Sequence, residues 1–204
     1  MVTTPTALLV HGTFTDASCW SGVITRLNRH SVPVTAPVIP LRGLAADAAY
    51  ISSVASRIAG PVVLVGHGYG GTVISVAGTA PNVVGLVYVS AYALDEGESP
   101  RDLERRFPSS ASDPGTAVVR TTASARCPVT ATHTEAPPVA AWKTRPSWMM
   151  LAGADPVSVP EAVRFCARRA EATLLEVDDA AHGIPRSHPT DVAELIRDAV
   201  RATT

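Results

Sequence analysis

Short runs of consecutive apolar residues recur along the chain, and each run ends at residues typical of turns. Runs of this length are typical of strands that are buried on both faces of a parallel sheet. Five runs fit this description, at residues 6–10, 62–65, 83–90, 148–152 and 173–177, and a weaker sixth lies at 32–36. The pattern therefore predicts a mostly parallel sheet of about six strands.

Segments with helical character alternate with these runs. They cover residues 18–29, 44–58, 70–80, 160–170 and 191–202, and a shorter one covers 101–107. Alternating strands and helices predict right-handed crossovers and an α/β fold with helices on both faces of the sheet. Since 204 residues suit one core better than two, we expect a single domain over residues 1–204.

The segment 92–146 interrupts this alternation. Residues 95–100 begin a stretch rich in Ser, Ala, Thr and Pro, and residues 108–138 show no clear periodicity. Long irregular segments in compact domains usually have a function. We expect a short, irregular cap insertion that covers one end of the sheet.

The composition of the chain argues against several classes of function. A hydrophobic fraction of 46%, a charged fraction of 17% and a net charge of −1 argue against disorder and against nucleic-acid binding. The three cysteines lack metal-ligand spacing, so we expect no metal and no cofactor. The N-terminus does not look like a signal peptide, and no apolar run could span a membrane. We therefore expect a cytoplasmic monomer or homodimer that acts on a small molecule.

The junction after the second strong run carries the most informative motif. Gly66, Gly68 and Gly70 have the spacing of the G-x-S-x-G elbow, in which a sharp strand-to-helix turn presents a nucleophilic serine beside an oxyanion hole. Glycine stands at the serine position. Because glycine offers no atom that can attack a carbonyl carbon, residue 68 cannot form an acyl-enzyme.

Other reactive residues follow the remaining predicted strands. Ligands of open α/β sheets bind at the carboxyl ends of the strands, so residues at these points are candidates for the site. They are His11 to Phe14 after the first strand, Ser90 to Tyr92 after the fourth, Asp155 after the fifth and His182 after the last. We expect all of them to face one opening.

In chain order, the His11-Gly12-x-Phe14 loop, the elbow, Asp155 and His182 resemble α/β-hydrolases, in the small bacterial group related to plant methylesterases and hydroxynitrile lyases. The resemblance implies an α/β-hydrolase fold, and the sequence departs from the family in a reduced cap, because the segment 92–146 is shorter than the cap that this family usually carries. It also implies that Asp155 is the acid and His182 the base of a catalytic pair, and that the backbone N–H groups of Thr13 and Tyr69 form the oxyanion hole.

A His-Asp pair with an oxyanion hole fits two kinds of reaction on a small organic substrate, such as a polyketide-like natural product. The base could activate water for hydrolysis, or it could remove a substrate proton and start elimination, cyclisation or C–C bond change. The resemblance also implies cofactor-independent oxygenation of an aromatic substrate as an alternative. Two others stay open: a non-catalytic ligand-binding or accessory protein, and a serine hydrolase with an engineered Ser-to-Gly change at Gly68.

Several further side chains are candidates for the substrate pocket or for a replacement nucleophile. We expect Phe14, Tyr92 and Ser90 to contact the substrate, because they follow predicted strands. Cys19 and Ser90 are candidate substitute nucleophiles. For Cys19, a small buried side chain is the favoured interpretation, since a reactive thiolate needs electropositive surroundings.

Other polar residues near the predicted site have structural interpretations. We expect His11 and His67 to pack beneath the site loops. Asp178 and Asp179 are expected in a solvent-exposed turn. The Arg168-Arg169 pair is expected on a solvated face.

Overall fold

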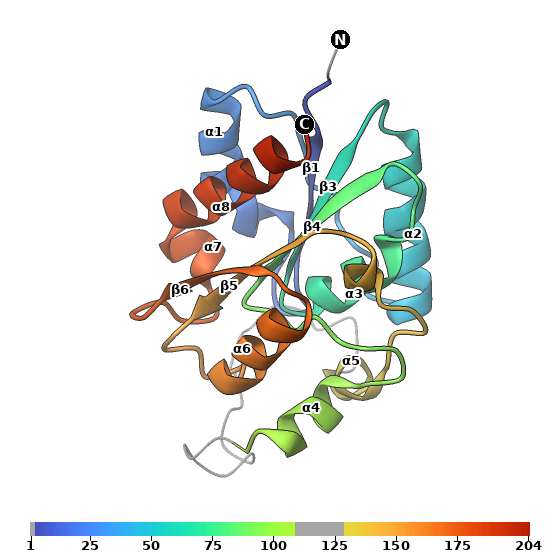
Figure 1. Ribbon diagram of the computed structural model, residues 1–204, viewed down its shortest axis with the longest axis vertical. Helices are drawn as coiled ribbons and strands as arrows, with labels where there is room; N and C mark the ends of the chain where they lie inside the picture. Colours follow the sequence, from blue (N-terminus) through green and yellow to red (C-terminus); the bar gives the residue numbers. More distant parts are fainter. Residues whose placement is uncertain (1–2, 109–128) are drawn as a thin grey trace.

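The computed structural model describes residues 3–108 and 129–204 and contains one six-stranded sheet, in the order β2-β1-β3-β4-β5-β6, with every pair parallel (Figure 1). The strands are β1 (Thr6–Val10), β2 (Val34–Thr35), β3 (Val62–His67), β4 (Val83–Val89), β5 (Ser147–Ala152) and β6 (Thr173–Val177). The predicted α/β-hydrolase architecture is confirmed, although β2 is shorter than the run that predicted it.

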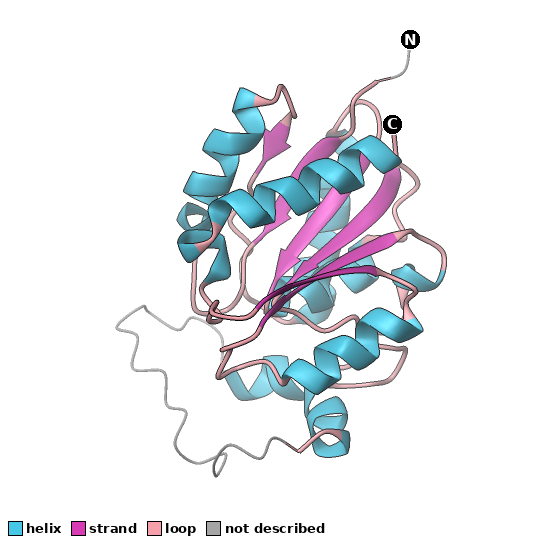
Figure 2. Cartoon of the chain, turned by 60° about the vertical axis from the view of Figure 1, so that its left-hand side comes forward, coloured by secondary structure: helices cyan, strands magenta, loops and turns pink. Residues whose placement is uncertain are grey.

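Helices cover both faces of the sheet, as Figure 2 shows. The helices α1 (Ser21–Arg29), α7 (Ile184–Ser187) and α8 (Pro189–Ala202) contribute to one apolar cluster. The helices α2 (Leu44–Arg57), α3 (Tyr69–Ala77) and α6 (Pro160–Arg169) contribute to the other. The described chain also has α4 (Pro100–Arg106), α5 (Val129–Thr134) and the 3-10 helices η1 (Ala17–Trp20) and η2 (Ala141–Lys143).

Most differences from the predicted elements lie at their ends. The predicted helix 18–29 begins as η1, and the predicted helix 191–202 begins two residues earlier, at Pro189. Within the segment predicted to be irregular, residues 129–134 form α5, so that expectation is wrong there. Residues 109–128 of the same segment lie outside the described residues.

The central strand β3 explains why the sequence shows continuous apolar runs. All six of its residues are buried. Side chains alternate across a strand, so Val62 and Leu64 pack into the cluster with α2 and α3, while Val63 and Val65 pack into the cluster with α1 and α8. Because both faces are covered, no polar alternation is required.

Strand order places a crevice at the carboxyl edge of the sheet. From β1 the chain first moves to β2 on one side and then returns to β3 on the other side of β1. Ligands of open α/β sheets bind where the order reverses in this way, just beyond the carboxyl ends of the strands. The loop after β1 and the turn after β3 both lie at this point.

Candidate active site

The turn between β3 and α3 keeps the geometry of a nucleophile elbow. Gly68 has φ +53° and ψ −120°, a backbone conformation that favours glycine. The flanking glycines have a packing reason: a Cβ on Gly66 would overlap the backbone of Gly70, and a Cβ on Gly70 would overlap the carbonyl of Val10. Glycine at these positions lets α3 approach β1 closely.

Asp155 and His182 form a hydrogen-bonded pair at this edge. The Nδ1 atom of His182 lies 2.9 Å from Oδ2 of Asp155. Asp155 is buried in the loop after β5, and its second oxygen, Oδ1, accepts a hydrogen bond from the amide of Val157 at 2.7 Å. An ionised carboxylate can only accept, so Nδ1 of His182 carries the proton and Nε2 is the basic atom of the neutral ring.

The basic nitrogen of His182 faces the position that a side chain at residue 68 would occupy. A Cβ on Gly68 would lie 3.1 Å from Nε2 and 3.4 Å from Cε1 of His182. Apart from the two chain neighbours of Gly68, no other atom of the described residues lies within 4 Å of that position. The missing side chain therefore leaves space directly beside the base.

The loops that carry Thr13 and Tyr69 lie against one another. A Cβ on Gly12 would lie 3.1 Å from the carbonyl oxygen of His67 and 3.7 Å from the amide nitrogen of Tyr69. Tyr69 is the first residue of α3, so its amide lies at the end of the helix that favours negative charge. The Tyr69 side chain is directed elsewhere, because its hydroxyl donates to the buried carboxylate of Asp47 at 2.9 Å.

The three residues predicted to bind substrate all follow β1 or β4. Phe14 is half-buried, whereas Ser90 and Tyr92 are buried. The Tyr92 hydroxyl accepts from the amide of Val159 at 2.8 Å and donates to Oε1 of Glu104 at 3.3 Å. Burial raises the pKa of the Tyr92 phenol, so it stays protonated. Tyr92 thus links the end of β4 to α4, and its contact with substrate remains a prediction.

Neither candidate substitute nucleophile has the surroundings of an activated group. Burial raises the pKa of the Cys19 thiol to about 11, so it is protonated at neutral pH. Ser90 has φ +43°, and its buried Oγ has no hydrogen-bond partner among the described residues, hence no base.

His11 and His67 pack beneath the loops, as predicted, and each has a specific partner. In His11, Nε2 accepts from the amide of Ile39 at 3.1 Å, and Nδ1 lies 2.8 Å from the carbonyl oxygen of Gly12. In His67, Nε2 lies 2.7 Å from the carbonyl oxygen of His182. Burial lowers the pKa of His67 to about 3. No sequence pattern indicated the contact between His67 and His182.

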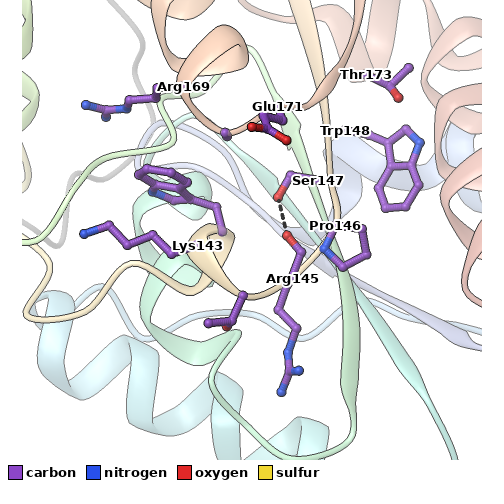
Figure 3. Close-up of a pocket in the computed structure, with 11 residues that line it drawn as sticks. Lys143, Arg145, Pro146, Ser147, Trp148, Arg169, Glu171 and Thr173 are labelled. Atoms are coloured by element: carbon purple, nitrogen blue, oxygen red, sulfur yellow. Dashed lines mark hydrogen bonds between the residues drawn. The ribbon is translucent and has the colours of Figure 1, made fainter.

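A cavity of about 600 Å³ lies at the opposite, amino edge of the sheet, where β5 and β6 begin. In Figure 3, Lys143 and Arg169, which line it, extend to the same side of the view, whereas Arg145 points away from both. Arg169 pairs with Glu98 at 2.5 Å, and its side chain is only 15% exposed. The expectation that Arg169 lies on a solvated face is therefore wrong, because this ion pair draws it inward.

Two further observations concern metals and membranes. Within the ranges 3–108 and 129–204, no three His, Cys, Asp or Glu side chains gather as metal ligands would. Across the same ranges, every helix is too short or too polar to cross a membrane.

The chain is similar to known proteins both in sequence and in fold. The sequence model described as the alpha/beta hydrolase family matches residues 7–195. No curated protein matches the sequence. A pyrethroid hydrolase from Sphingobium faniae JZ-2 is 19% identical, with 98% of each chain covered and a TM-score of 0.75. Polyneuridine aldehyde esterase is 17% identical, with 96% of this chain and 99% of that one covered and a TM-score of 0.76. A methylesterase from Arabidopsis is 18% identical, with 97% and 99% covered and a TM-score of 0.71.

Proposed function

Because the chain belongs to the alpha/beta hydrolase family, we propose that it hydrolyses an ester bond in a small organic molecule by direct attack of water. One observation carries the proposal: His182 Nε2 faces open space at the position where a side chain on residue 68 would lie. The fold neighbours named esterase and hydrolase support the choice of an ester.

In the first step, a water molecule occupies the space beside Gly68 and hydrogen-bonds to Nε2 of His182. Its oxygen attacks the carbonyl carbon of the ester while its proton passes to Nε2. The carboxylate of Asp155, 2.9 Å from Nδ1, stabilises the imidazolium that results. Nothing becomes attached to the protein.

In the second step, the charge on the former carbonyl oxygen is stabilised by the amides of Thr13 and Tyr69, the latter at the positive end of α3. The tetrahedral intermediate then collapses. The C–O bond to the alcohol breaks, and the departing oxygen takes the proton from Nε2 of His182. The products are a carboxylic acid and an alcohol, and the His182-Asp155 pair is restored.

Proton abstraction from the substrate itself is the second candidate. It uses the same Nε2 atom, and the same open space would admit an acidic C–H or O–H group directly to the base. No water would then be consumed. This route would produce elimination, cyclisation or C–C bond change instead of an acid and an alcohol.

The decisive experiment compares the wild type with His182→Ala and Asp155→Asn on a panel of small esters and phenolic carbon acids. We expect ester hydrolysis without a burst phase, and a loss of about 10²- to 10⁴-fold in kcat/KM in each variant. Equal rates in wild type and His182→Ala would contradict the proposal. Conversion of carbon acids alone would favour proton abstraction, and binding without turnover would favour an accessory role.

A second experiment returns a hydroxyl to the elbow. Gly68→Ser places a Cβ at 3.1 Å from His182 Nε2, so the imidazole has to shift slightly to accept the serine as a hydrogen-bond donor. We expect this variant to show burst acylation with 4-nitrophenyl esters or labelling by a fluorophosphonate. A folded variant that shows neither would mean that the oxyanion donors and the base do not act together.

A further inference from the structure

His67 is the last residue of β3 and directly precedes Gly68. Its side chain is 1% exposed and extends from beneath the elbow to the loop that carries the base. There, Nε2 lies 2.7 Å from the carbonyl oxygen of His182, a residue 115 positions away in the chain. The contact joins the end of β3 to the loop of His182. A mechanism without a nucleophilic side chain at residue 68 needs these two segments in fixed relative positions.

The partners of His67 fix its tautomer. A carbonyl oxygen can only accept a hydrogen bond, so Nε2 of His67 carries the proton and donates it. Nδ1 is buried and has no hydrogen-bond partner among the described residues, so this nitrogen carries no proton and has a free lone pair. A proton there would be a buried donor without an acceptor, which is costly.

The charge of His67 matters for its neighbour. The rings of His67 and His182 pack with their centroids 4.7 Å apart. A cationic His67 would oppose the positive charge that His182 acquires when it takes a proton. Burial of His67 disfavours its charged form and lowers its pKa to about 3, so the ring stays neutral and leaves His182 free to become protonated.

Two further contacts restrict the orientation of His67. The indole of Trp20 lies edge-on to its ring, with centroids 6.2 Å apart. On the other side, the Gly12 backbone lies so near that a Cβ there would be 3.6 Å from Nδ1 of His67. The ring is therefore enclosed between the η1 segment, the loop that leads to Thr13 and the loop of His182.

We propose that His67 is a positioning residue, which holds the His182 loop through the bond from Nε2 to the His182 carbonyl and thereby keeps the His182 imidazole aligned with Asp155 and the space at Gly68. The consequence for catalysis rests on the proposed function, whereas the alignment itself does not. His182 is 21% exposed, so burial alone does not fix its ring. The bond to Asp155 orients the ring, and the bond from His67 holds the backbone from which the ring extends.

The test uses proton NMR of the full chain. The Nδ1 proton of His182, which is bonded to a carboxylate, gives a downfield resonance. The resonance is assigned by its disappearance in His182→Ala. His67→Phe keeps a ring but removes the donor, and His67→Gln keeps a donor near the position of Nε2. We expect the resonance to shift or broaden in His67→Phe and to be retained in His67→Gln. Asn82→Ala is the matched control, since it also removes a side-chain bond to a backbone carbonyl, that of Ala55, at 2.8 Å.

The same comparison is made for reactivity in the Gly68→Ser background with a fluorophosphonate. We expect His67→Phe to lower the labelling rate about ten- to hundred-fold, as a small misplacement of a catalytic group does. His67→Gln should restore most of the rate, and Asn82→Ala should leave it unchanged even if the midpoint of unfolding falls. An unaltered resonance and rate in folded His67→Phe would overturn the proposal.

Should His67→Phe fail to fold, long-range ¹H–¹⁵N spectra of the wild type provide the decisive measurement. We expect His67 to be neutral, with the proton on Nε2, from pH 5 to pH 8, and a proton on Nδ1 would overturn the proposal. The NMR readouts do not depend on turnover. A protein without esterase activity whose His182 resonance responds to His67→Phe would therefore contradict the proposed function and support the positioning role.

Discussion

The two edges of the sheet differ in how their polar side chains are directed. At the carboxyl edge, Asp155 pairs with Nδ1 of His182, Nε2 of His182 faces the space beside Gly68, and α3 begins there at Tyr69. At the amino edge lies a cavity of about 600 Å³, but two of the cations that line it pair with carboxylates outside it, Lys143 with Asp95 and Arg169 with Glu98. This cavity and the pair formed by Asp155 and His182 therefore lie at opposite edges of the sheet.

The fold supplies a physical reason for this difference. Each helix that follows a parallel strand begins at the carboxyl edge and ends at the amino edge, so the carboxyl edge receives the positive helix ends. α3 begins there at Tyr69, whereas α6 ends at the amino edge with Arg168 and Arg169. Negative charge is therefore favoured at the carboxyl edge, and cations at the amino edge are stabilised by helix ends and ion pairs.

The largest expected effect on stability tests the packing that builds the carboxyl edge. Gly70→Ala would place a Cβ against the carbonyl of Val10, and backbone overlap of this kind should cost about 3 kcal/mol or more of unfolding free energy. Gly183→Ala is the control beside His182, because no described atom lies within 4 Å of its added Cβ and its φ is −73°. Urea denaturation measures both. Equal stability of the two variants would contradict the close approach of α3 and β1.

The second effect is a dependence of stability on pH that originates at the carboxyl edge. The pKa of His67 is about 3 in the folded chain and about 6.5 when exposed, so the unfolded chain binds a proton that the folded chain excludes. The stabilisation is complete above pH 6.5 and decreases as the pH falls toward 3. Between pH 7 and pH 5 the loss should be about 2 kcal/mol.

His67→Gln removes the titrating group while keeping a donor, so its unfolding free energy should lack this part of the acid dependence. Urea denaturation of wild type and variant at pH 7, 6 and 5 provides the measurement. All other ionisable groups are common to the two proteins and cancel in the difference. Parallel curves would contradict the prediction, because they would mean that the pKa of His67 is the same in the folded and the unfolded chain.

Most of the fold could be predicted because β1, β3, β4 and β5 are almost entirely buried. The expectation of a buried strand is wrong for β6, which lies at one edge of the sheet and is largely exposed, and for β2 at the other edge, which is half-buried. The run at 173–177 coincides with β6, and the run at 148–152 begins one residue after β5. Two short helices escaped prediction for a physical reason. α7 has four residues, too few for a helical period, and α5 has the sequence Val-Thr-Ala-Thr-His-Thr, which has no apolar face.

The candidate site was predictable only as a set of positions. Strand ends and the resemblance indicated Asp155 and His182, but their separation of 2.9 Å depends on how two loops after β5 and β6 fold back. The bond from His67 to the His182 carbonyl could not be predicted, because its acceptor is a backbone atom common to every residue. The inward position of Arg169 depends on the loop that brings Glu98 to α6.

The third effect tests whether the charges at the amino edge are structural. Arg169 donates to Glu98 and to the carbonyl of Ala93, and the two charged side chains are 15% and 19% exposed. Glu98→Gln leaves a largely buried cation without its counter-charge. After allowance for its partial exposure, we expect a loss of about 1–3 kcal/mol of unfolding free energy, with kcat/KM for esters unchanged. Arg168→Gln, at the exposed neighbour, is the control and should change neither quantity.

The smallest effect provides the sharpest test of the comparison between the edges. Arg145 lines the amino-edge cavity, and among the described residues its side chain makes a single hydrogen bond, to the carbonyl of Gly78, which is long at 3.4 Å. Arg145→Ala should therefore change the unfolding free energy by no more than about 0.5 kcal/mol. Its kcat and KM for esters should match those of the wild type, whereas Asp155→Asn should abolish most turnover. A rise in KM in Arg145→Ala without a loss of stability would mean that the amino-edge cavity binds substrate, and the assignment of function to the carboxyl edge alone would fail.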